Sequence, residues 1–192
     1  MGGVSFIALQ DIYKGQQIRK ELRIPLDAKV VLSVGEINKN KNHIIGIKAL
    51  AKLKDPSIYY VICGRGSLLE RLKKLAKEIK VEDKVIFAGY RTNVADFYRM
   101  ADLFLFPSFR EGLPVSLIEA MASGLPIIAT KIRGINDLVE QDLLFTPMDV
   151  EGMTNAIEKM QLRKVKYEIA VFDLHKVVNL LKEVYKIGQN EE

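Results

Sequence analysis

The sequence predicts an α/β domain in which helices cover both faces of a doubly wound parallel sheet. Short apolar runs alternate along the chain with segments of helical periodicity, so each helix can cross over between parallel strands. The runs are rich in β-branched residues and show no polar alternation, which indicates strands buried on both faces. With 192 residues, 48% of them hydrophobic, the chain is long enough for one well-packed domain and short for two.

The predicted strands are short, and the first two end at a glycine. Val30–Val34 is followed by Gly35, and Ile58–Cys63 is followed by Gly64. Further strands are predicted at Val85–Ala88, Leu103–Phe106, Ile127–Thr130 and Leu143–Phe145. Ligands of such sheets bind at the carboxyl ends of the strands, so the loops that follow the strands are where a site is expected.

The helices are predicted from apolar residues that recur three and four positions apart. They are expected at Ile44–Leu53, Ser67–Ile79, Val94–Met100, Val115–Ser123, Val150–Met160 and Leu174–Ile187. Ser67 and Asp149 stand where a side chain can cap a helix start. Gly124 follows the helix that begins at Val115 and is expected to stop it.

The two ends of the chain are predicted to lie outside the sheet domain. Residues 1–28 show no clean period and are interpreted as a leader or linker with one short helix around Gln17–Leu22. The domain is assigned to residues 29–165, and residues 166–192 are assigned to a C-terminal helical segment. The apolar stripe of its helix is expected to be partly exposed, which suggests self-association.

Composition and the chain start argue against several classes of protein. The longest apolar runs have the length of strands, whereas a membrane-spanning helix needs about 20 apolar residues. The first residues lack the basic and apolar regions of a secretory signal, and a single cysteine, Cys63, allows no disulfide framework. We therefore expect a cytoplasmic protein.

The net charge of +5 suits an anionic ligand. A basic nucleic-acid binder remains a rival interpretation, but no recognition motif accompanies the charge, so we expect no nucleic-acid partner. The chain has one cysteine, two histidines and no Asp-x-Asp motif, so we expect no metal. His43 stands just before a predicted helix and is interpreted as a surface or capping residue.

The loop at residues 107–114 carries the strongest functional signal. A helix begins directly after it, near Val115, and the free amides at a helix start form an anion site. Glu111 in the loop and Glu119 one turn inside the helix can accept hydrogen bonds from hydroxyl groups. This arrangement suits a ligand with hydroxyls on both sides of a phosphate, such as a nucleotide-sugar. Alone, Glu119 would more simply complement the helix dipole.

The stretch from Glu111 to Thr130, Glu-Gly-Leu-Pro-Val-Ser-Leu-Ile-Glu-Ala-Met-Ala-Ser-Gly-Leu-Pro-Ile-Ile-Ala-Thr, closely resembles the signature of the family-4 retaining glycosyltransferases, which have the GT-B fold (glycosyl transferases group 1). Other segments resemble that family in order and spacing: Val31–Gly35 with Lys41, Val61–Gly66, Val85–Tyr90 and Ala101–Ser108. The resemblance covers about residues 29 to 160. It implies the Rossmann-like C-terminal half of such an enzyme, the half that holds the nucleotide-sugar donor.

The resemblance also implies roles for individual residues. Lys41 would neutralise the leaving diphosphate and Glu111 would bind hydroxyls of the donor sugar, so these two are the catalytic candidates. Glu119 would bind the ribose hydroxyls. Further donor contacts would come from Gly35, Gly89, Tyr90, Arg91, Gly112, Leu113, Val115 and Ser116, mostly through the main chain. Two interpretations of the Tyr90 ring stay open, stacking on the base or covering the edge of the sheet.

Four features depart from the family pattern. Glu36 stands where many relatives have an arginine, which leaves Lys41, helped by Lys39, as the cation for the diphosphate. Pro114 stands where many relatives have glycine, so one amide donor is missing. The segment at 140–147 lacks the Asn-Gly turn often found before its strand. The N-terminal acceptor-binding domain of a complete enzyme is expected to be missing from this chain.

The sequence thus predicts the donor-binding domain of a glycosyltransferase that needs no cofactor. The parent enzyme would move a hexose-type sugar from a UDP- or GDP-linked donor to a glycan or lipid-linked acceptor in polysaccharide assembly. Its partner would be the missing N-terminal domain, through which any membrane contact, at the inner face, would be peripheral. The isolated domain is expected to bind donor and barely to catalyse. The alternative is a non-catalytic nucleotide-binding or interaction module that kept the donor fold.

Overall fold

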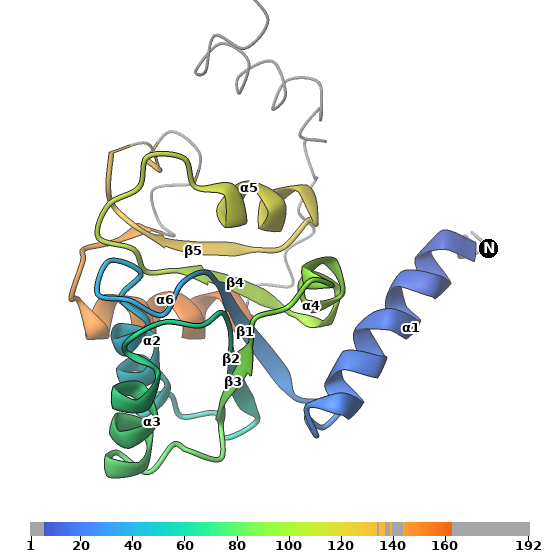
Figure 1. Ribbon diagram of the computed structural model, residues 1–192, viewed down its shortest axis with the longest axis horizontal. Coiled ribbons are helices and arrows are strands. Elements are labelled where there is room, and N and C mark those ends of the chain that lie inside the picture. The colour runs from blue at the N-terminus through green and yellow to red at the C-terminus, as the bar shows by residue number, and fades with distance from the viewer. Residues whose placement is uncertain (1–5, 134, 137–138, 140–143, 163–192) are drawn as a thin grey trace, which may run out of the picture.

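The computed structural model describes residues 6–133, 135–136, 139 and 144–162 of the chain. One parallel sheet runs through it, in the order β3-β2-β1-β4-β5-β6 (Figure 1). The strands are β1 Lys29–Val34, β2 Ile58–Cys63, β3 Val85–Gly89, β4 Leu103–Phe106, β5 Ile127–Thr130 and β6 Leu144–Phe145. The helices are α1 Phe6–Glu21, α2 His43–Leu50, α3 Leu69–Glu78, α4 Val94–Met100, α5 Val115–Ala122 and α6 Val150–Leu162.

Helices α2, α3 and α6 lie on one face of the sheet, and α4 and α5 lie on the other (Figure 1). The strand order confirms the predicted doubly wound fold. It reverses between β1 and β4, so the crossovers leave these two strands in opposite directions. The loops that follow them, residues 35–42 and 107–114, meet at this point and are called the switch-point loops below.

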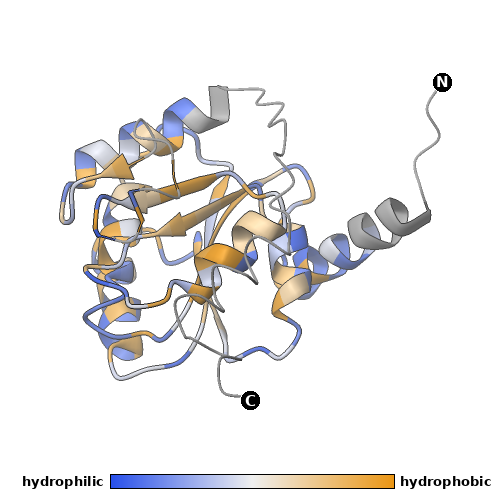
Figure 2. Ribbon diagram, turned by 90° about the horizontal axis from the view of Figure 1, so that it is seen from above, coloured by the Kyte–Doolittle hydropathy of each residue, from blue (hydrophilic) through white to orange (hydrophobic). Residues whose placement is uncertain are grey.

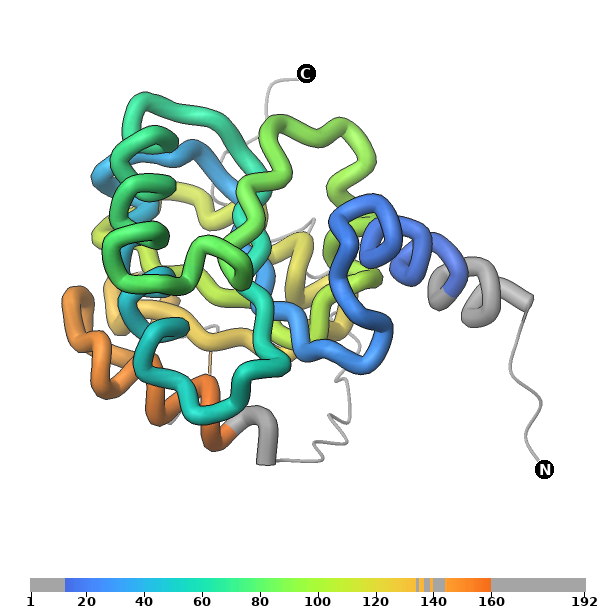
Figure 3. The backbone as a smooth tube through the Cα atoms, turned by 90° about the horizontal axis from the view of Figure 1, so that it is seen from below, coloured from blue at the N-terminus to red at the C-terminus, as the bar shows by residue number. Residues whose placement is uncertain are grey.

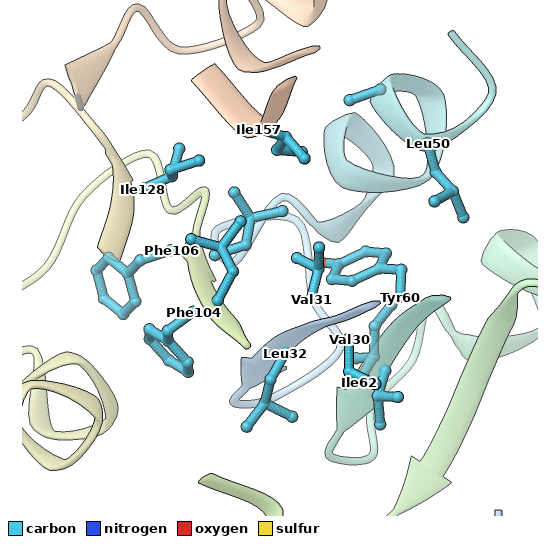
Figure 4. Packing of buried hydrophobic residues seen from close by; sticks show 14 of the residues in the cluster. Val30, Val31, Leu32, Leu50, Tyr60, Ile62, Phe104, Phe106, Ile128 and Ile157 are labelled. Carbon is cyan, nitrogen blue, oxygen red and sulfur yellow. The ribbon is translucent and has the colours of Figure 1, made fainter. Parts of the chain in front are cut away.

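The core fills the space on both sides of the central strands. Strands β4 and β5 are buried along their whole length, as the uninterrupted apolar runs predicted. Figure 2 shows the strands as the hydrophobic centre of the molecule. Val31 and Tyr60 are paired across β1 and β2, and Figure 4 shows their side chains on the side of α2 and α6, near Leu50 and Ile157. The ring of Tyr60 packs against Gly46 of α2, where no larger residue fits.

The helix ends agree in part with the expected caps. Gly124 follows α5 with φ +71°, the left-handed conformation of a helix stop, as predicted. Asp149 accepts a hydrogen bond from the Gly152 amide (2.8 Å) and caps the start of α6, also as predicted. Ser67 does not cap α3, because that helix begins at Leu69 and Leu68 takes the capping position.

The N-terminal segment differs from the expectation of a leader or linker with a short helix around 17–22. Helix α1 spans Phe6–Glu21 and packs against α4, beside which it lies in Figure 3. Gly15 allows the close approach, because a Cβ atom there would lie 2.8 Å from the Arg99 carbonyl oxygen. Ile18 is buried in the contact.

A buried arginine completes the docking of α1. The Arg19 guanidinium donates to the carbonyls of Met100 (2.9 and 2.7 Å) and Ala28 (2.6 Å) and pairs with Asp102 at 2.9 Å. Asp102 also accepts a hydrogen bond from the Val30 amide, at the start of β1. The second half of α1 therefore belongs to the packed structure. The helix predicted at Leu174–Ile187 and its self-association lie outside the described residues.

Candidate functional site

Three hydrogen bonds that involve the main chain join the switch-point loops to each other. The Phe109 amide donates to the Asn40 carbonyl (2.9 Å), and the Asn40 side-chain amide donates to the Arg110 carbonyl (2.9 Å). The Asn42 side chain donates to the Pro107 carbonyl (3.2 Å). Asparagine suits this last position because Asn42 has φ +52°, a left-handed conformation that asparagine tolerates. The bonds fix the two loops as one unit at the carboxyl edge of the sheet.

The structure brings the two catalytic candidates together. The ammonium of Lys41, from the first loop, lies 2.8 Å from the carboxylate of Glu111, from the second. The side chains are only 21% and 10% exposed, so water screens their attraction less than at an open surface. The Lys41 ammonium also lies 5.3 Å from the centre of the Phe106 ring. The sequence named both residues but gave no sign of their pairing, because 70 positions separate them.

Glycines end the three neighbouring strands β1, β2 and β3. The Gly35 amide donates to Cys63 and the Gly64 amide donates to Gly89, so the turns are hydrogen-bonded in sequence across the edge. A Cβ atom at Gly64 would overlap the Gly35 carbonyl oxygen, whereas a Cβ atom at Gly89 would meet nothing within 4 Å. Gly89 has φ +73° and open space beside it, which fits its expected role of letting a ligand approach the main chain. The corresponding space at Gly35 is covered by the Lys41 side chain.

A pocket of about 320 Å³ opens beside these turns. Its lining includes Gly35, Glu36, Cys63, Gly64, Tyr90 and Arg91. Tyr90 is 68% exposed, and its ring lies 5.1 Å from the Arg65 guanidinium, which stacks over it. So exposed a residue does not cover the edge of the sheet, and stacking of the ring on a base stays a prediction.

The side chain of Arg91 is engaged with the rest of the fold. It donates to the Ala88 carbonyl (2.8 Å), pairs with Glu21 of α1 at 2.7 Å and lies over the ring of Phe97 of α4 (5.2 Å). The guanidinium thus ties α1 and α4 to the end of β3. The expected contact of this position with a ligand is left to its main chain.

The start of α5 is the expected anion site, with one difference. Pro114 takes the capping position and provides no side-chain cap, and Gly112 and Leu113 precede it in the loop. The Val115 amide donates to the Leu113 carbonyl (3.0 Å), so it is not free for a phosphate as expected. The Leu113 and Ser116 amides have no backbone partner among the described residues, so these two amides at the helix start can donate to an anion.

Glu119 lies one turn inside α5 on its exposed face, as predicted, and contacts a tyrosine that the sequence analysis missed. The Tyr98 hydroxyl, from α4, donates to the Glu119 carboxylate (2.8 Å) and lies 3.2 Å from the Ser116 carbonyl. Burial and the hydrogen bond to Glu119 raise the pKa of Tyr98, so its hydroxyl stays protonated and remains a donor. A sequence signal for this contact is lacking, because the two residues lie on different helices.

His43 was expected at the surface or as a cap, and this is wrong. The residue is 2% exposed and begins α2. Its Nδ1 lies 3.4 Å from the Tyr60 hydroxyl, which lies 2.9 Å from the Ser33 hydroxyl. Burial lowers the pKa of His43 to about 4 and keeps the imidazole neutral. The apolar residues that follow it in α2 draw the ring into the core with them.

No three His, Cys, Asp or Glu side chains within the described ranges group closely enough to hold a metal ion. Glu36, which replaces the arginine of many relatives, is exposed and accepts a hydrogen bond from the side-chain amide of Asn38 (2.9 Å). The positive charge beside Glu111 therefore comes from Lys41. None of the described helices is long and apolar enough to cross a membrane.

Together, a parallel sheet, glycine turns at its carboxyl edge, a pocket beside them and a helix start facing the switch point define a Rossmann-like domain with a candidate ligand site. The family model described as glycosyl transferases group 1 matches residues 15–168, and the chain belongs to this family.

Two curated relatives illustrate the match. The chain is 32% identical over 145 residues to the lipopolysaccharide core biosynthesis glycosyltransferase LpsE of Rhizobium meliloti, with 74% of this chain and 42% of the relative covered. It is 28% identical over 187 residues to the UDP-Gal:alpha-D-GlcNAc-diphosphoundecaprenol alpha-1,3-galactosyltransferase of Escherichia coli, with 92% and 48% covered. The chain thus spans less than half the length of these two relatives.

Solved structures show the same fold. The chain superposes on Anabaena Alr3699/HepE in complex with UDP and glucose with a TM-score of 0.78 at 21% identity, covering 91% of this chain and 52% of that one. It superposes on the C-terminal domain of the group 1 glycosyltransferase LpcC from Francisella tularensis with a TM-score of 0.68 at 22% identity, covering 90% and 93%. The second match confirms the fold class of a C-terminal domain of this family.

Proposed function

We propose that this chain is the donor-binding half of a glycosyltransferase that moves a hexose-type sugar from a UDP- or GDP-linked donor to a glycan or lipid-linked acceptor. The observation that carries the proposal is the Lys41–Glu111 pair, held at the switch point of a group 1 family domain. A relative is named for transfer from UDP-Gal to a diphosphoundecaprenol-linked sugar, and a structural neighbour was solved with UDP and glucose. Both names support this class of donor and acceptor.

In the proposed site Lys41 and Glu111 act on opposite sides of the bond that breaks, the bond between the donor sugar and the diphosphate. The Lys41 ammonium turns toward the diphosphate, whose negative charge grows as the sugar leaves, and the Leu113 and Ser116 amides of the α5 start assist it. Glu111 then accepts hydrogen bonds from the hydroxyls of the donor sugar. Because the switch-point loops are bonded to each other, their main chain stands in place before the donor arrives, and only the Lys41 and Glu111 side chains part from each other to meet it.

The nucleotide end of the donor occupies the pocket beside Gly89. Its ribose hydroxyls bond to Glu119, and the base lies against the exposed Tyr90 ring with its edge on the main chain of residues 89–91. No metal is needed in this scheme, because Lys41 and the helix amides supply the positive charge. The acceptor is bound by an N-terminal domain, and any contact with the inner face of a membrane is made through that domain. The sugar keeps its anomeric configuration in the transfer.

A thermal-shift panel tests the proposal. UDP, GDP, ADP and their common sugar conjugates are added at millimolar concentration, with and without EDTA. A ligand at 100 times its dissociation constant adds about 2.7 kcal/mol, which raises the midpoint of a domain of this size by about 5–10 °C. We expect a shift selective for one base and unchanged by EDTA. No shift with any nucleotide would overturn the proposal, and a shift lost in EDTA would overturn its metal-free form.

A transfer assay separates an enzyme half from a binding module. The chain alone should hydrolyse the donor slowly at most. It should transfer sugar when an N-terminal domain of the family is supplied. Donor binding with no transfer in the presence of such a domain would point to a module that only binds nucleotides.

A further inference from the structure

We propose that Tyr98 of α4 is a positioning residue that holds the Glu119 carboxylate in the orientation in which it receives the ribose hydroxyls. The inference rests on the proposed function, since it concerns the same nucleotide site. It assigns to the short helix α4, which carries no expected donor contact of its own, a part in recognition of the nucleotide.

The contact joins the buried side chain of Tyr98 to the exposed side chain of Glu119. Tyr98 is 3% exposed, and its ring packs against Phe104 of β4 with the centres 5.7 Å apart. Glu119 lies on the exposed face of α5, where a glutamate samples several rotamers. The bond of 2.8 Å from the Tyr98 hydroxyl to Oε2 selects one of them. The other oxygen, Oε1, is then left to accept hydroxyl groups of a ligand.

The hydroxyl of Tyr98 has a single proton and two acceptors within reach. The Ser116 carbonyl lies at 3.2 Å, whereas the Glu119 carboxylate is closer and charged. The carboxylate therefore accepts the hydrogen bond, and the proton stays on the tyrosine. Burial raises the pKa of Tyr98, and the hydrogen bond to Glu119 raises it further. The hydroxyl therefore stays protonated and donates this hydrogen bond at neutral pH. The orientation of Glu119 is therefore preset rather than induced by the ligand.

The position of α4 explains why the contact is firm. On one side the helix packs on α1, where Gly15 allows close approach and Arg19 bonds to the Met100 carbonyl at the end of α4. In the middle of the helix the Arg91 guanidinium lies over the Phe97 ring. Tyr98 thus projects from a helix that is held in its middle and at its end, and its hydroxyl holds the exposed carboxylate against this fixed helix.

The test compares nucleotides with and without ribose hydroxyls. Dissociation constants of the full chain for UDP and GDP, and for the 2′,3′-dideoxy form of each, are measured by calorimetry for the wild type, Tyr98→Phe and Tyr60→Phe. The phenylalanine at position 98 keeps the ring and removes only the hydroxyl. Tyr60 is the matched control, because it is another buried tyrosine with hydrogen-bonded hydroxyl, placed under α2.

Tyr98→Phe should weaken binding of the ribonucleotide three- to tenfold and leave the dideoxy form within twofold. Tyr60→Phe should lower the midpoint of unfolding and leave the ratio between the two ligands unchanged. In a Glu119→Ala background, where the ribonucleotide binds at least fivefold more weakly, the Tyr98→Phe change should have no further effect. A Tyr98→Phe variant that weakens both ligands equally, or neither, would overturn the inference.

The outcomes also separate this inference from the function on which it rests. A wild type that binds none of the nucleotides contradicts the proposed function itself. A wild type that binds the ribonucleotide and the dideoxy form equally well removes the ribose role of Glu119, and the positioning role of Tyr98 falls with it. If the wild type distinguishes the two and Tyr98→Phe does so equally, only the role of Tyr98 is wrong. Should Tyr98→Phe fail to fold, Glu119→Asp shortens the carboxylate from the other side of the contact, and it should lose the same selectivity.

Discussion

The two halves of the candidate site are built in opposite ways. The switch-point loops are bonded to each other and carry a Lys41–Glu111 pair that is largely withdrawn from solvent. The turns after β2 and β3 carry an exposed Tyr90 ring, and beside Gly89 they leave open space. Charge must be placed accurately to act on a transition state, whereas an aromatic surface tolerates small shifts of its ligand. The rigid half suits the reacting end of a donor and the open half suits its base.

The halves meet where the Gly64 turn touches the Gly35 carbonyl, and the largest effect is expected there. Gly64→Ala places a methyl group on a backbone oxygen that cannot move without displacing β1, and it should lower the free energy of unfolding by at least about 3 kcal/mol. Urea denaturation measures the loss. Gly112→Ala is the control in the rigid half: a Cβ atom there meets nothing within 4 Å, and stability should hold within about 0.5 kcal/mol. Similar losses in both variants would contradict the close contact between the halves.

The sequence predicted the sheet, the strand ends and the loop that carries Glu111, because these depend on local periodicity and on one general rule about parallel sheets. It missed α1 as a docked helix. That helix is attached through a glycine and a buried arginine, Gly15 and Arg19, and not through a broad apolar stripe. A search for periodic apolar residues does not detect such an attachment.

The pairings within the site were out of reach for a different reason. Lys41 with Glu111, and Tyr98 with Glu119, are contacts between elements that only the finished fold brings together. His43 was misplaced because a histidine next to a helix start more often faces solvent, and here the burial of α2 outweighs that preference. Local pattern thus located the site but not the contacts that hold its charges in place.

The buried His43 makes the rigid half sensitive to acid. Its pKa is about 4 in the folded protein and 6.5 when unfolded, so the unfolded chain takes up the proton first as the pH falls. Stability is complete above pH 6.5 and is lost as the pH falls from there toward 4, by about 2 kcal/mol at pH 5. His43→Gln, which cannot titrate, should remove this part of the pH dependence in urea denaturation. If both proteins lost the same stability between pH 7.5 and pH 5, His43 would not be the group responsible.

The charge of the rigid half is tested by Lys41→Met, which keeps an aliphatic chain against Gly35 and removes the ammonium. Binding of the nucleoside diphosphate should weaken about tenfold, roughly 1.4 kcal/mol, while binding of the nucleoside should hold within twofold. Calorimetry with both ligands measures the difference. Lys48→Met is the control, because Lys48 is exposed on α2 and carries no expected donor contact, and it should change either affinity less than twofold. Equal losses for diphosphate and nucleoside would show that Lys41 acts by supporting the fold.

The smallest effect is expected in the open half, at Tyr90. The residue is 68% exposed, so Tyr90→Ala should change the free energy of unfolding by less than about 0.5 kcal/mol. Nucleotide affinity should nevertheless fall about fivefold, since stacking of a base on an aromatic ring is worth about 1 kcal/mol or more. Tyr90→Phe keeps the ring, with its contact to Arg65, and should bind as the wild type does. If Tyr90→Ala kept full nucleotide affinity, the Tyr90 ring would not stack on the base. The base of the nucleotide would then be bound by the main chain of residues 89–91 alone.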